Sequence, residues 1–372
     1  MSTIKVNTID NEGGAVDFPN KLTVRGNAIE RTYTSSGTEP SSPSNGDFWY
    51  DTGNDVLKHY INSEFKTISL KAAFSWGGAR GLFFGGLLSN FYSLSNVIDY
   101  ITIASAGNAT DFGDMTSAIQ NSSALSNRSR AVIGGGYTTT YQSNIQYVET
   151  ATTGNGTNFG ALTVARNNSG ACSDGTYGLF GGGYTGAASD TIDYITVATT
   201  GDATDFGNLT SGAYGVSALS DATYGLFVLG RTGTYVYVNT IDYVTIATTG
   251  NASDFGDATV SLGYRACCSD TTRGIIAGGA SGGTSTYVNV IEYVTIASTG
   301  NATDFGDLSD DVSAMAAVSD GTYGVISHGL NDSYQIVNTL DTITIQTTGN
   351  ATDFGDLSVA RSRLTGASGN AS

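Results

Sequence analysis

The chain has 372 residues, of which 50 are Gly and only 3 are Pro, and 13% of its residues are charged. The 40% share of hydrophobic residues excludes a disordered chain, and the scarcity of Pro excludes a collagen triple helix. The net charge of −17 argues against nucleic acid and anionic membranes as partners, because both attract basic surfaces. Val, Ile, Thr and Tyr mixed with Gly, Asn and Asp are typical of short β-strands joined by tight turns.

The sequence carries no run of the roughly 18 apolar residues that cross a membrane as a helix, so we expect no membrane insertion. The first ten residues, MSTIKVNTID, lack the apolar core of a secretory signal. We therefore expect synthesis in a cytoplasm and no export by the secretory signal route. Three Cys residues are too few for a disulfide framework.

The composition changes near residue 70. All three Pro and all five Lys residues lie within the first 71 positions, and every later Lys or Arg position is Arg. We therefore expect a small β-rich N-terminal module over residues 1–70 and one long domain over residues 71–372. Within the module, turn signals at 52–54 and 62–63 predict three alternating strands between residues 40 and 68.

The long domain consists of six repeats of one supersecondary unit. The phrase TDFGD or a close variant recurs at intervals of 47 to 50 residues, around Phe112, Phe159, Phe206, Phe255, Phe305 and Phe354. Two further phrases, typified by IDYITI and YGLFGGG, recur with it. Because each unit repeats the same strand and turn signals, the six units should form six copies of one small sheet.

One unit illustrates the predicted sheet. Around Gly178 the alternation predicts four strands, over residues 169–173, 177–183, 191–198 and 205–209. Apolar residues stand on both faces of the third strand, so both faces should be covered. Four strands in about 48 residues, buried on both sides, are typical of a propeller blade. A parallel β-helix, which has shorter coils, is the second interpretation.

We therefore predict an all-β fold, a six-bladed β-propeller preceded by the small β-rich module. The last unit stops after the segment that matches a first strand, and the first unit begins with its second strand near residue 81. Residues 364–368 could complete that blade and close the ring, which would remove its open edges. Residues 72–75 could fill the same place, and the sequence leaves both alternatives open.

Residues 71–372 resemble kelch-type propellers. The units carry a double glycine after the second strand, as at Gly182-Gly183, and an acid–Tyr pair in the third strand, as at Asp193-Tyr194. Phe206 stands where kelch units carry Trp, so the chain is similar to a divergent member. The resemblance implies the kelch-like propeller fold.

Units of the type DYITIASAGNATDFGD also resemble structural proteins of tailed phages, especially marine, cyanophage-like ones. The start MSTIKVNTID resembles the start of tail-fibre and virion proteins, and residues 40–68 resemble a small β-meander of such fibres. This resemblance implies assembly into the virion after synthesis in the host cytoplasm. It also implies that residues 1–70 attach to other tail or capsid proteins and that the chain forms a homo-oligomer, such as the trimer common among fibres.

The residues offer little for catalysis. Only His59 and His328 are present, so a copper site built from several His and Tyr ligands is excluded. No Ser-His-Asp set, P-loop or CxxC motif occurs. Cys172 and Cys268 stand at equivalent positions before Ser-Asp, which favours small buried residues over a reactive pair, and Cys267 has no assigned role. We expect no enzyme and no catalytic residue.

The repeated loop TTGNATDFGD gathers Asn and Asp oxygens, which are calcium ligands. The same residues form turns through local hydrogen bonds, and their presence in every unit favours a role in the fold. We expect no metal and no cofactor, with calcium binding as the alternative.

All length variation among the units lies between the second and third strands. The spacing from the acid of the third strand (Gln146 in one unit) to the recurring Phe is 13 residues in all six units, whereas that from the second to the third strand ranges from 15 to 18. In antiparallel blades these six loops emerge on one face. They are rich in Tyr, Ser, Thr, Gly and Asn, the residues that antibodies use for contact.

We therefore expect the loop face to bind a partner through eight tyrosines, Tyr92, Tyr137, Tyr141, Tyr184, Tyr235, Tyr237, Tyr287 and Tyr334. The hypothesis is a non-enzymatic tail fibre or adhesin whose loops recognise a host-surface polysaccharide. The alternative is a purely structural virion component (a capsid decoration, neck or baseplate part) whose propeller packs on neighbouring virion proteins. The loops could also vary simply because nothing constrains them.

Overall fold

The chain is built from β-strands, as predicted. The computed structural model describes residues 22–24, 27–29, 33–36, 38–45, 47–51, 56–61, 63–67, 78–232, 236–281 and 286–369. By its internal contacts the chain divides into two units, residues 1–73 and 74–372, with the division close to the change in composition. In the described part of the chain, no helix is long and apolar enough to span a membrane.

The first unit contains two small sheets. Its strands are β1 (Leu22–Val24), β2 (Asn27–Ile29), β3 (Tyr33–Ser36), β4 (Phe48–Asp51), β5 (Val56–Ile61) and β6 (Glu64–Thr67). β4, β5 and β6 form the predicted antiparallel meander, and β3 extends it by pairing with β4 in parallel. Trp49 holds this sheet together. Its ring packs edge-on against Phe65 at 5.3 Å, and its indole N–H donates to the carbonyl of Ser36 at 3.0 Å.

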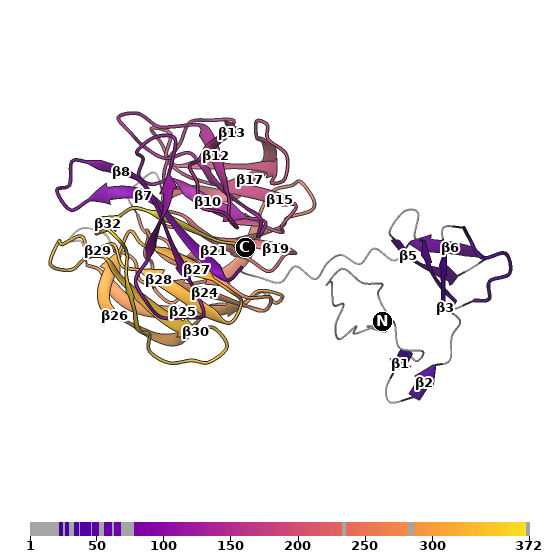
Figure 1. Cartoon of the computed structure of the whole chain (residues 1–372). Coiled ribbons are helices and arrows are strands. Elements are labelled where there is room, and N and C mark those ends of the chain that lie inside the picture. Colours follow the sequence, from indigo (N-terminus) through magenta and orange to yellow (C-terminus); the bar gives the residue numbers. More distant parts are fainter. Residues whose placement is uncertain are drawn as a thin grey trace. The chain divides into compact units, whose positions relative to one another are not determined.

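The second unit is a six-bladed β-propeller (Figure 1). Blade 1 comprises β10 (Ser123–Ser126), β11 (Arg130–Gly134), β12 (Asn144–Glu149) and β13 (Thr157–Ala161). Blade 2 comprises β14 (Gly170–Ser173), β15 (Tyr177–Gly181), β16 (Ser189–Thr196) and β17 (Thr204–Tyr214). Blade 3 comprises β18 (Ser217–Ser220), β19 (Tyr224–Val228), β21 (Thr240–Thr245) and β22 (Ser253–Asp257). In each blade the first strand lies nearest the propeller axis.

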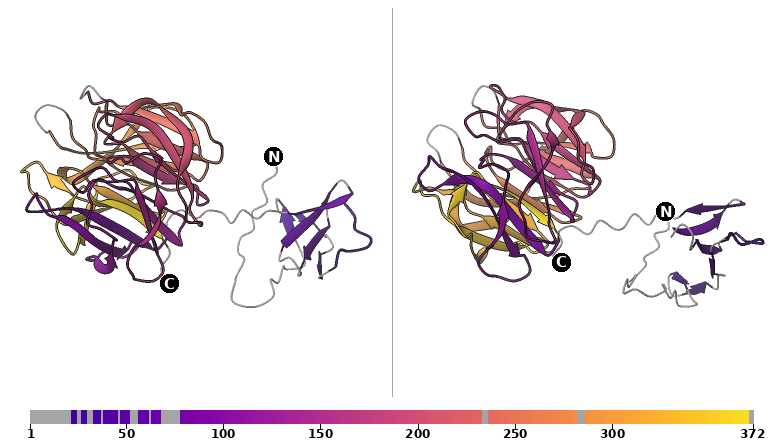
Figure 2. Two further views of the ribbon diagram at one scale, coloured as in Figure 1. Left: turned by 90° about the horizontal axis from the view of Figure 1, so that it is seen from above. Right: turned by 45° about the horizontal axis from the view of Figure 1, so that its top comes forward.

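The remaining blades follow the same order around the axis (Figure 2). Blade 4 comprises β23 (Ala266–Ser269), β24 (Arg273–Ala277), β25 (Val288–Thr295) and β26 (Thr303–Ser313). Blade 5 comprises β27 (Ala316–Ser319), β28 (Tyr323–Ser327), β30 (Thr339–Thr344) and β31 (Thr352–Asp356). Blade 6 comprises β33 (Thr365–Gly369), β7 (Arg80–Leu88), β8 (Leu94–Thr102) and β9 (Thr110–Asp114). Three short strands, β20 (Arg231–Thr232), β29 (Leu330–Asn331) and β32 (Arg361–Ser362), pair with β17, β26 and β7.

The first two strands of a blade are joined by a tight turn that the sequence specifies directly. In blade 2 the Asp174 carboxylate accepts hydrogen bonds from the backbone N–H groups of Thr176 and Tyr177, both at 2.7 Å. Gly175, which follows Asp174, has φ +85°, a backbone angle that residues with a side chain rarely adopt. The phrase SDGT therefore makes the hairpin turn that its composition predicted.

The ring is closed by the C-terminal segment. Strand β33 pairs antiparallel with β7, from Thr365 opposite Phe84 to Gly369 opposite Arg80. In Figure 1 the purple start of the propeller accordingly lies beside its yellow end. Blade 6 thus takes its inner strand from one end of the domain and its other strands from the other end, as proposed for residues 364–368. The competing segment, 72–75, lies outside the described residues.

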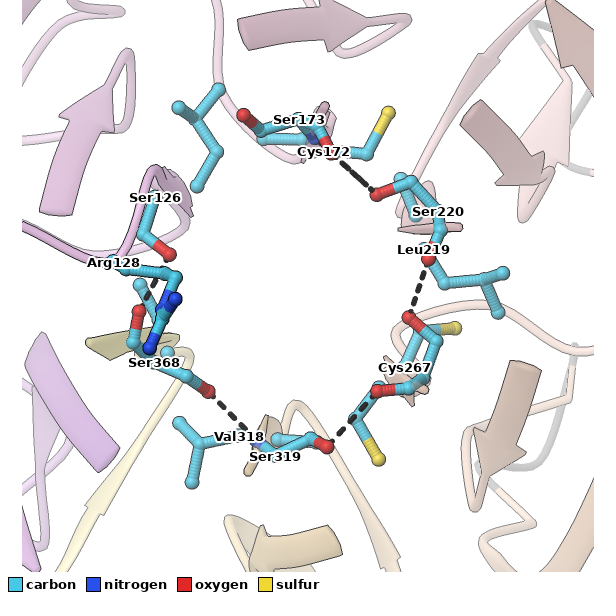
Figure 3. Close-up of a pocket in the computed structure, with 18 residues that line it drawn as sticks. Ser126, Arg128, Cys172, Ser173, Leu219, Ser220, Cys267, Val318, Ser319 and Ser368 are labelled. Atoms are coloured by element: carbon cyan, nitrogen blue, oxygen red, sulfur yellow. Dashed lines mark hydrogen bonds between the residues drawn. The ribbon is translucent and has the colours of Figure 1, made fainter. Parts of the chain in front are cut away.

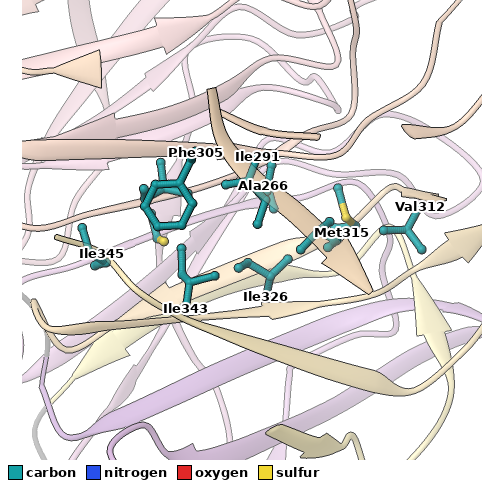
Figure 4. Packing of buried hydrophobic residues seen from close by; sticks show 12 residues of the cluster. Ala266, Ile291, Phe305, Val312, Met315, Ile326, Ile343 and Ile345 are labelled. Atoms are coloured by element: carbon teal, nitrogen blue, oxygen red, sulfur yellow. The ribbon is translucent and has the colours of Figure 1, made fainter. Parts of the chain in front are cut away.

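Six hydrophobic cores lie between successive blades rather than within a common centre. Between blades 4 and 5, for example, Phe305 and Ile291 pack against Ile326, Ile343 and Met315 (Figure 4). The core between blades 6 and 1 and the core between blades 5 and 6 both contain residues from near the two ends of the domain. Because every blade is buried on both faces, the strands carry apolar residues on both sides.

The repeated GNATDFGD loop joins neighbouring blades at the periphery. In blade 1, Gly154 N–H donates to the carbonyl of Phe112 in blade 6 at 2.9 Å, and Asn155 Oδ1 accepts from the N–H of Asp114 at 3.0 Å. A side chain on Gly113 would place its Cβ 2.5 Å from the carbonyl oxygen of Gly154. The same contacts recur at all six blade junctions. These oxygens therefore serve the fold through bonds between blades.

A second set of bonds between blades lies deep in the propeller. The acid or amide of each third strand is buried and accepts bonds from a Thr or Ser that follows the recurring Phe of the preceding blade. In blade 2, Asp193 accepts from the N–H of Thr163 at 2.9 Å and from its hydroxyl at 2.6 Å. Each such bond ties the end of one blade to the middle of the next.

The six buried positions balance their charge in different ways. Asp193 pairs with Arg166 at 2.9 Å, and Asp99 pairs with the equivalent Arg361 at 2.7 Å. Glu292 pairs with Arg265, which does not occupy the repeat position shared by Arg166 and Arg361. At the fifth position Asp341 contacts His328 instead of an arginine. At another the residue is Gln146, which carries no charge to balance.

His328, which follows β28 rather than lying within a strand, places Nε2 2.9 Å from a carboxylate oxygen of Asp341. Burial alone would raise the pKa of Asp341, but hydrogen bonds from His328 and Ser309 hold it below its usual value. In the described part of the chain, Asp242 has its bonds to Thr210 but no ion-pair partner, and burial raises its pKa. The contribution of ion pairing to stability should therefore differ among these six equivalent positions.

Closure should dominate the stability of the propeller. A chain ending at residue 360 loses β32 and β33, exposes the edge of β7, and leaves Asp99 buried without Arg361. We expect it to lose at least about 5 kcal/mol of unfolding free energy or to aggregate, because it loses both a buried ion-pair partner and core side chains. Chemical denaturation followed by circular dichroism measures this. A chain ending at residue 369 is the control, and equal midpoints for the two truncations would contradict closure by β33.

Two Asp→Asn substitutions at equivalent positions should differ strongly in their effect on stability. Asp193→Asn leaves Arg166 buried without its partner and should cost about 3–5 kcal/mol. Asp242→Asn removes an unpaired buried charge and should change stability at neutral pH by less than about 1 kcal/mol, or increase it. Gln146 shows that one amide oxygen can accept both bonds from the preceding blade.

The pH dependence of stability tests whether the charge of Asp242 opposes folding. Because the pKa of Asp242 is raised in the folded state, its ionisation costs stability progressively as the pH rises from the ordinary Asp pKa through the raised one, and the full cost remains above it. Any advantage of Asn over Asp at this position should therefore shrink as the pH falls. Denaturation midpoints of the two variants across acidic to neutral pH measure the effect, and equal losses at both positions would contradict the assignment.

Candidate functional site

A narrow channel runs along the propeller axis between the inner strands. Its volume is about 100 Å³, and most of the side chains that line it are small, with Leu125, Leu219, Val318 and Arg128 as the larger ones. One mouth is surrounded by a serine from the C-terminal end of each inner strand (Figure 3), namely Ser126, Ser173, Ser220, Ser269, Ser319 and Ser368. Ser220 Oγ donates to the carbonyl of Ser173 at 2.9 Å, and Ser269 Oγ donates to that of Ser220 at 2.8 Å. Serine bonds therefore join neighbouring inner strands at this mouth.

The three cysteines lie around this channel. Cys172 and Cys268 are buried in the cores between blades, where a Cβ on Gly225 or Gly324 of the next blade would lie 2.7 or 2.9 Å from their sulfur atoms. They are the small buried residues that their repeat positions indicated. Cys267 lines the channel, and burial raises the pKa of its thiol to about 12. A thiol with that pKa is a poor nucleophile at neutral pH.

The opposite mouth is framed by a closed ring of backbone hydrogen bonds. Its six members precede the inner strands of the six blades, and all have φ between +55° and +64°: Asn121, Asn168, Gly215, Tyr264, Ala314 and Arg363. Each N–H donates to the carbonyl of the member in the preceding blade, over 2.8 to 3.1 Å. We call these residues the axial ring. Their backbone is fixed by these bonds, whereas their side chains differ in size and chemistry.

The variable loops lie at this same mouth. Two of them begin with a Tyr that pairs through its backbone with the residue preceding an axial-ring member, Tyr137 with Gln120 and Tyr184 with Asn167. The length-variable loops and the axial ring therefore build one face, which we call the axial face. The sequence had indicated only the loops.

Aromatic side chains follow one another across the axial face. Ring centroids are 5.6 Å apart for Tyr137 and Tyr141, 5.7 Å for Tyr141 and Tyr184, and 5.0 Å for Tyr184 and Tyr214. Arg231 then lies 5.1 Å from the ring centroids of both Tyr214 and Tyr237. Such stacks leave aromatic faces and edges available to a ligand while holding the rings in place.

The other side of the axial face continues this arrangement. Tyr287 and Tyr334 have ring centroids 6.0 Å apart. Burial and the nearby Tyr334 raise the pKa of Tyr287, while the Arg363 guanidinium acts to lower it. Arg363 in turn donates from Nη1 to Oε1 of Gln120 at 3.1 Å. Arg363 thus lies between the tyrosines of the two sides.

The axial face is hollowed over blades 6, 1 and 2. The pocket has a volume of about 380 Å³ and is lined by Gln120, Asn121, Tyr137, Tyr141, Asn167, Asn168, Tyr184, Tyr214 and Arg363. Its lining combines aromatic rings, amides and one guanidinium, and none of these nine residues is acidic. Asn167 is only 7% exposed, and its Oδ1 is buried with no hydrogen-bond partner. A buried acceptor without a donor is costly, so a donor from a bound molecule would stabilise it.

The eight predicted tyrosines divide into distinct groups. Tyr137, Tyr141 and Tyr184 come together in the pocket. Tyr237, Tyr287 and Tyr334 lie elsewhere on the axial face, with Tyr287 largely buried and Tyr334 56% exposed. Tyr92 stands apart at a loop tip and is 91% exposed. Tyr235 lies outside the described residues.

The sequence-based prediction included neither the pocket amides Gln120, Asn121, Asn167 and Asn168 nor four other residues of the axial face. Tyr214 ends β17, and Tyr264 and Arg363 precede the inner strands of their blades, in a part of the unit whose constant length gives no signal of variation. Arg231 belongs to a variable loop but is not a Tyr. The available signal was variation in residue type at constant spacing, since the six axial-ring positions carry five different residue types.

The chain matches no protein-family model, and no curated protein is significantly similar to it in sequence. Within the described ranges, no three His, Cys, Asp or Glu side chains gather as a metal site would require. The chemistry that the axial face does present is non-covalent. It offers aromatic surfaces, amide donors and acceptors, and guanidinium groups on a rigid backbone.

Three tyrosines of the axial face, Tyr141, Tyr237 and Tyr287, should lose their protons only at unusually high pH. Burial, with Tyr184 and Tyr137, raises the pKa of Tyr141, and burial raises those of Tyr237 and Tyr287. Because the folded state then holds these protons more tightly than the unfolded state, stability should fall as the pH rises above about 10. Ultraviolet titration of the phenolate band, native against denatured, should show a late fraction that Tyr141→Phe reduces. Superimposable titrations of the native and denatured protein would contradict the packing described.

Proposed function

We propose that this protein is a non-enzymatic tail fibre or adhesin of a tailed phage, and that its axial face binds a host-surface glycan. The main observation in support is that aromatic and amide side chains are concentrated at one mouth of the propeller, in and beside loops that vary in length. Sugars are bound by such surfaces because aromatic rings cover their apolar faces and amides bond to their hydroxyls.

The contrast between the two mouths supports this proposal. One mouth is surrounded by repeated serines that bond to each other, and its lining residues are similar in all blades except for Arg128 of blade 1. At the other, six blades hold one backbone arrangement in place and present six different sets of side chains. Variation carried on a rigid scaffold is the usual arrangement of a recognition surface.

The phage assignment rests on the resemblance of the repeat and of the chain's first residues to virion proteins of the kelch-like propeller type. In this proposal residues 1–70 attach the protein to the tail, and the protein acts in the virion as a homo-oligomer. A small unit joined to a propeller that carries the binding face suits such a division of labour. The same resemblance fits a structural virion component whose propeller packs on its neighbours.

The residues most often used in catalysis have structural roles here. His328 is buried against Asp341, and Cys172 and Cys268 fill cores between blades. The channel thiol of Cys267 has a pKa of about 12. These placements favour a binding role over an enzymatic one.

Adsorption to cells tests the proposal. Fluorescently labelled full-length protein is applied to a panel of bacteria that includes hosts of marine phages, and bound protein is measured by flow cytometry. The triple variant Tyr137→Ala, Tyr141→Ala, Tyr184→Ala should lose at least about tenfold in adsorption to any strain that binds the unaltered protein, since each ring contributes contact area at the pocket.

The matched control replaces three exposed threonines in the loops between third and fourth strands, Thr153→Ala, Thr200→Ala and Thr249→Ala. These loops lie at the periphery of the propeller, on the side opposite the axial face, so adsorption should not change. Thermal denaturation confirms that both variants are folded. Unchanged adsorption of a folded tyrosine variant would overturn the adhesin proposal and favour a propeller that packs on other virion proteins.

A further inference from the structure

We propose that the pocket on the axial face binds one acidic sugar residue, of the uronic acid type, within the glycan. This inference rests on the proposed function and specifies its ligand. It assigns the aromatic rings to the sugar's apolar face, the amides to its hydroxyls and Arg363 to its carboxylate.

The aromatic wall has the form that a sugar ring requires. Tyr137, Tyr141, Tyr184 and Tyr214 line the pocket and contact one another in sequence, with centroid distances of 5.0 to 5.7 Å. All four are at least partly buried, so their positions are set before a ligand arrives. A preformed wall of this kind binds without a large cost in side-chain ordering.

The amides give the pocket polar selectivity. Gln120, Asn121, Asn167 and Asn168 line it together. The buried Oδ1 of Asn167 lacks a donor within the protein, and a sugar hydroxyl would supply one. A purely apolar ligand would leave this oxygen unsatisfied, which disfavours a hydrophobic side chain of a protein partner.

The charge of the pocket selects an acidic ligand. Arg363 is exposed, carries the sole charge among the nine lining residues, and contributes its guanidinium beside Gln120. It lies in a chain of net charge −17, whose general field would repel anions. A guanidinium at this point therefore creates a local site for a carboxylate, which it binds through charge-assisted hydrogen bonds.

The pocket volume suits one sugar residue rather than a folded partner. About 380 Å³ lies near the lower end of the range for small-molecule pockets. The pocket is open to the surface of the axial face, so neighbouring sugars of a chain could extend toward Tyr237 and Tyr287. A free carboxylate would use Arg363 alone and would leave the aromatic wall and Asn167 unoccupied.

Binding of three small probes to the full-length protein tests this inference. Saturation-transfer NMR titrations use sodium glucuronate, glucose and sodium acetate. We expect glucuronate to bind about tenfold more tightly than glucose, and acetate to show no saturable binding. Arg363→Gln should abolish the preference while leaving glucose binding intact, and Arg363→Lys should keep part of it. Asn167→Ala and Tyr184→Ala should weaken both sugars about equally.

Arg130→Gln is the charge-matched control, because Arg130 lies beside a first-to-second-strand turn at the opposite mouth and should not affect either sugar. Equal binding of glucuronate and glucose, or a preference that survives Arg363→Gln, would overturn the inference. Acetate binding as tightly as glucuronate would show an anion site without sugar recognition and would overturn it as well.

Measured beside the adsorption test, these titrations separate the two proposals. Loss of adsorption in the tyrosine variant without a glucuronate preference would retain the adhesin and reject this ligand. A preference that depends on Arg363, in a protein that adsorbs to no cells, would retain the pocket and reject the host-surface role.

Discussion

The structure depends on one packing constraint: a blade has two apolar faces and can bury them only between two neighbours. The six cores accordingly lie between blades, and the ring must close for the first and last of them to exist. Strand β33 meets this requirement by pairing with β7 across the two ends of the domain. Closure is therefore part of the hydrophobic core itself, because Leu364 and Ala367 belong to the cores on either side of blade 6.

The same constraint explains the recurring polar residues. An apolar interface does not fix the angle or register of two sheets, whereas directional bonds do. The Gly-Asn loops at the periphery, the buried acids in the third strands and the serines at one mouth each repeat at blade junctions. Asp193, Asp242 and Gln146 accept equivalent bonds from the preceding blade. Asp193 also has an arginine partner, Asp242 has no ion-pair partner among the described residues, and Gln146 carries no charge. The geometry of the bond is thus retained while its electrostatics vary.

The repeat made the fold predictable, because spacing alone revealed six units and the turn chemistry of Asp174-Gly175 located their hairpins. The C-terminal closing strand was predicted as one of two alternatives, and only pairing with β7 decides between them. The face that carries the variable loops also followed from topology. The pocket did not, because Tyr214 lies at the end of β17 and Arg363 in the left-handed backbone of the axial ring, in a part of the unit whose length does not vary. The pocket brings together residues that are distant in sequence, and the repeat pattern does not predict which of them meet.

The axial ring also shows how this fold can acquire specificity without losing stability. Its hydrogen bonds use only backbone atoms, and the left-handed conformation is held in Asn121, Ala314 and Arg363 as well as in Gly215. The ring bonds therefore do not depend on the side chains at these positions, although the Arg363 side chain also bonds to Gln120. Substitution there changes the chemistry at the mouth of the channel while the cores between blades stay intact. A propeller with this division can present new ligand contacts on an unchanged scaffold, which is the property that a surface selected for recognition requires.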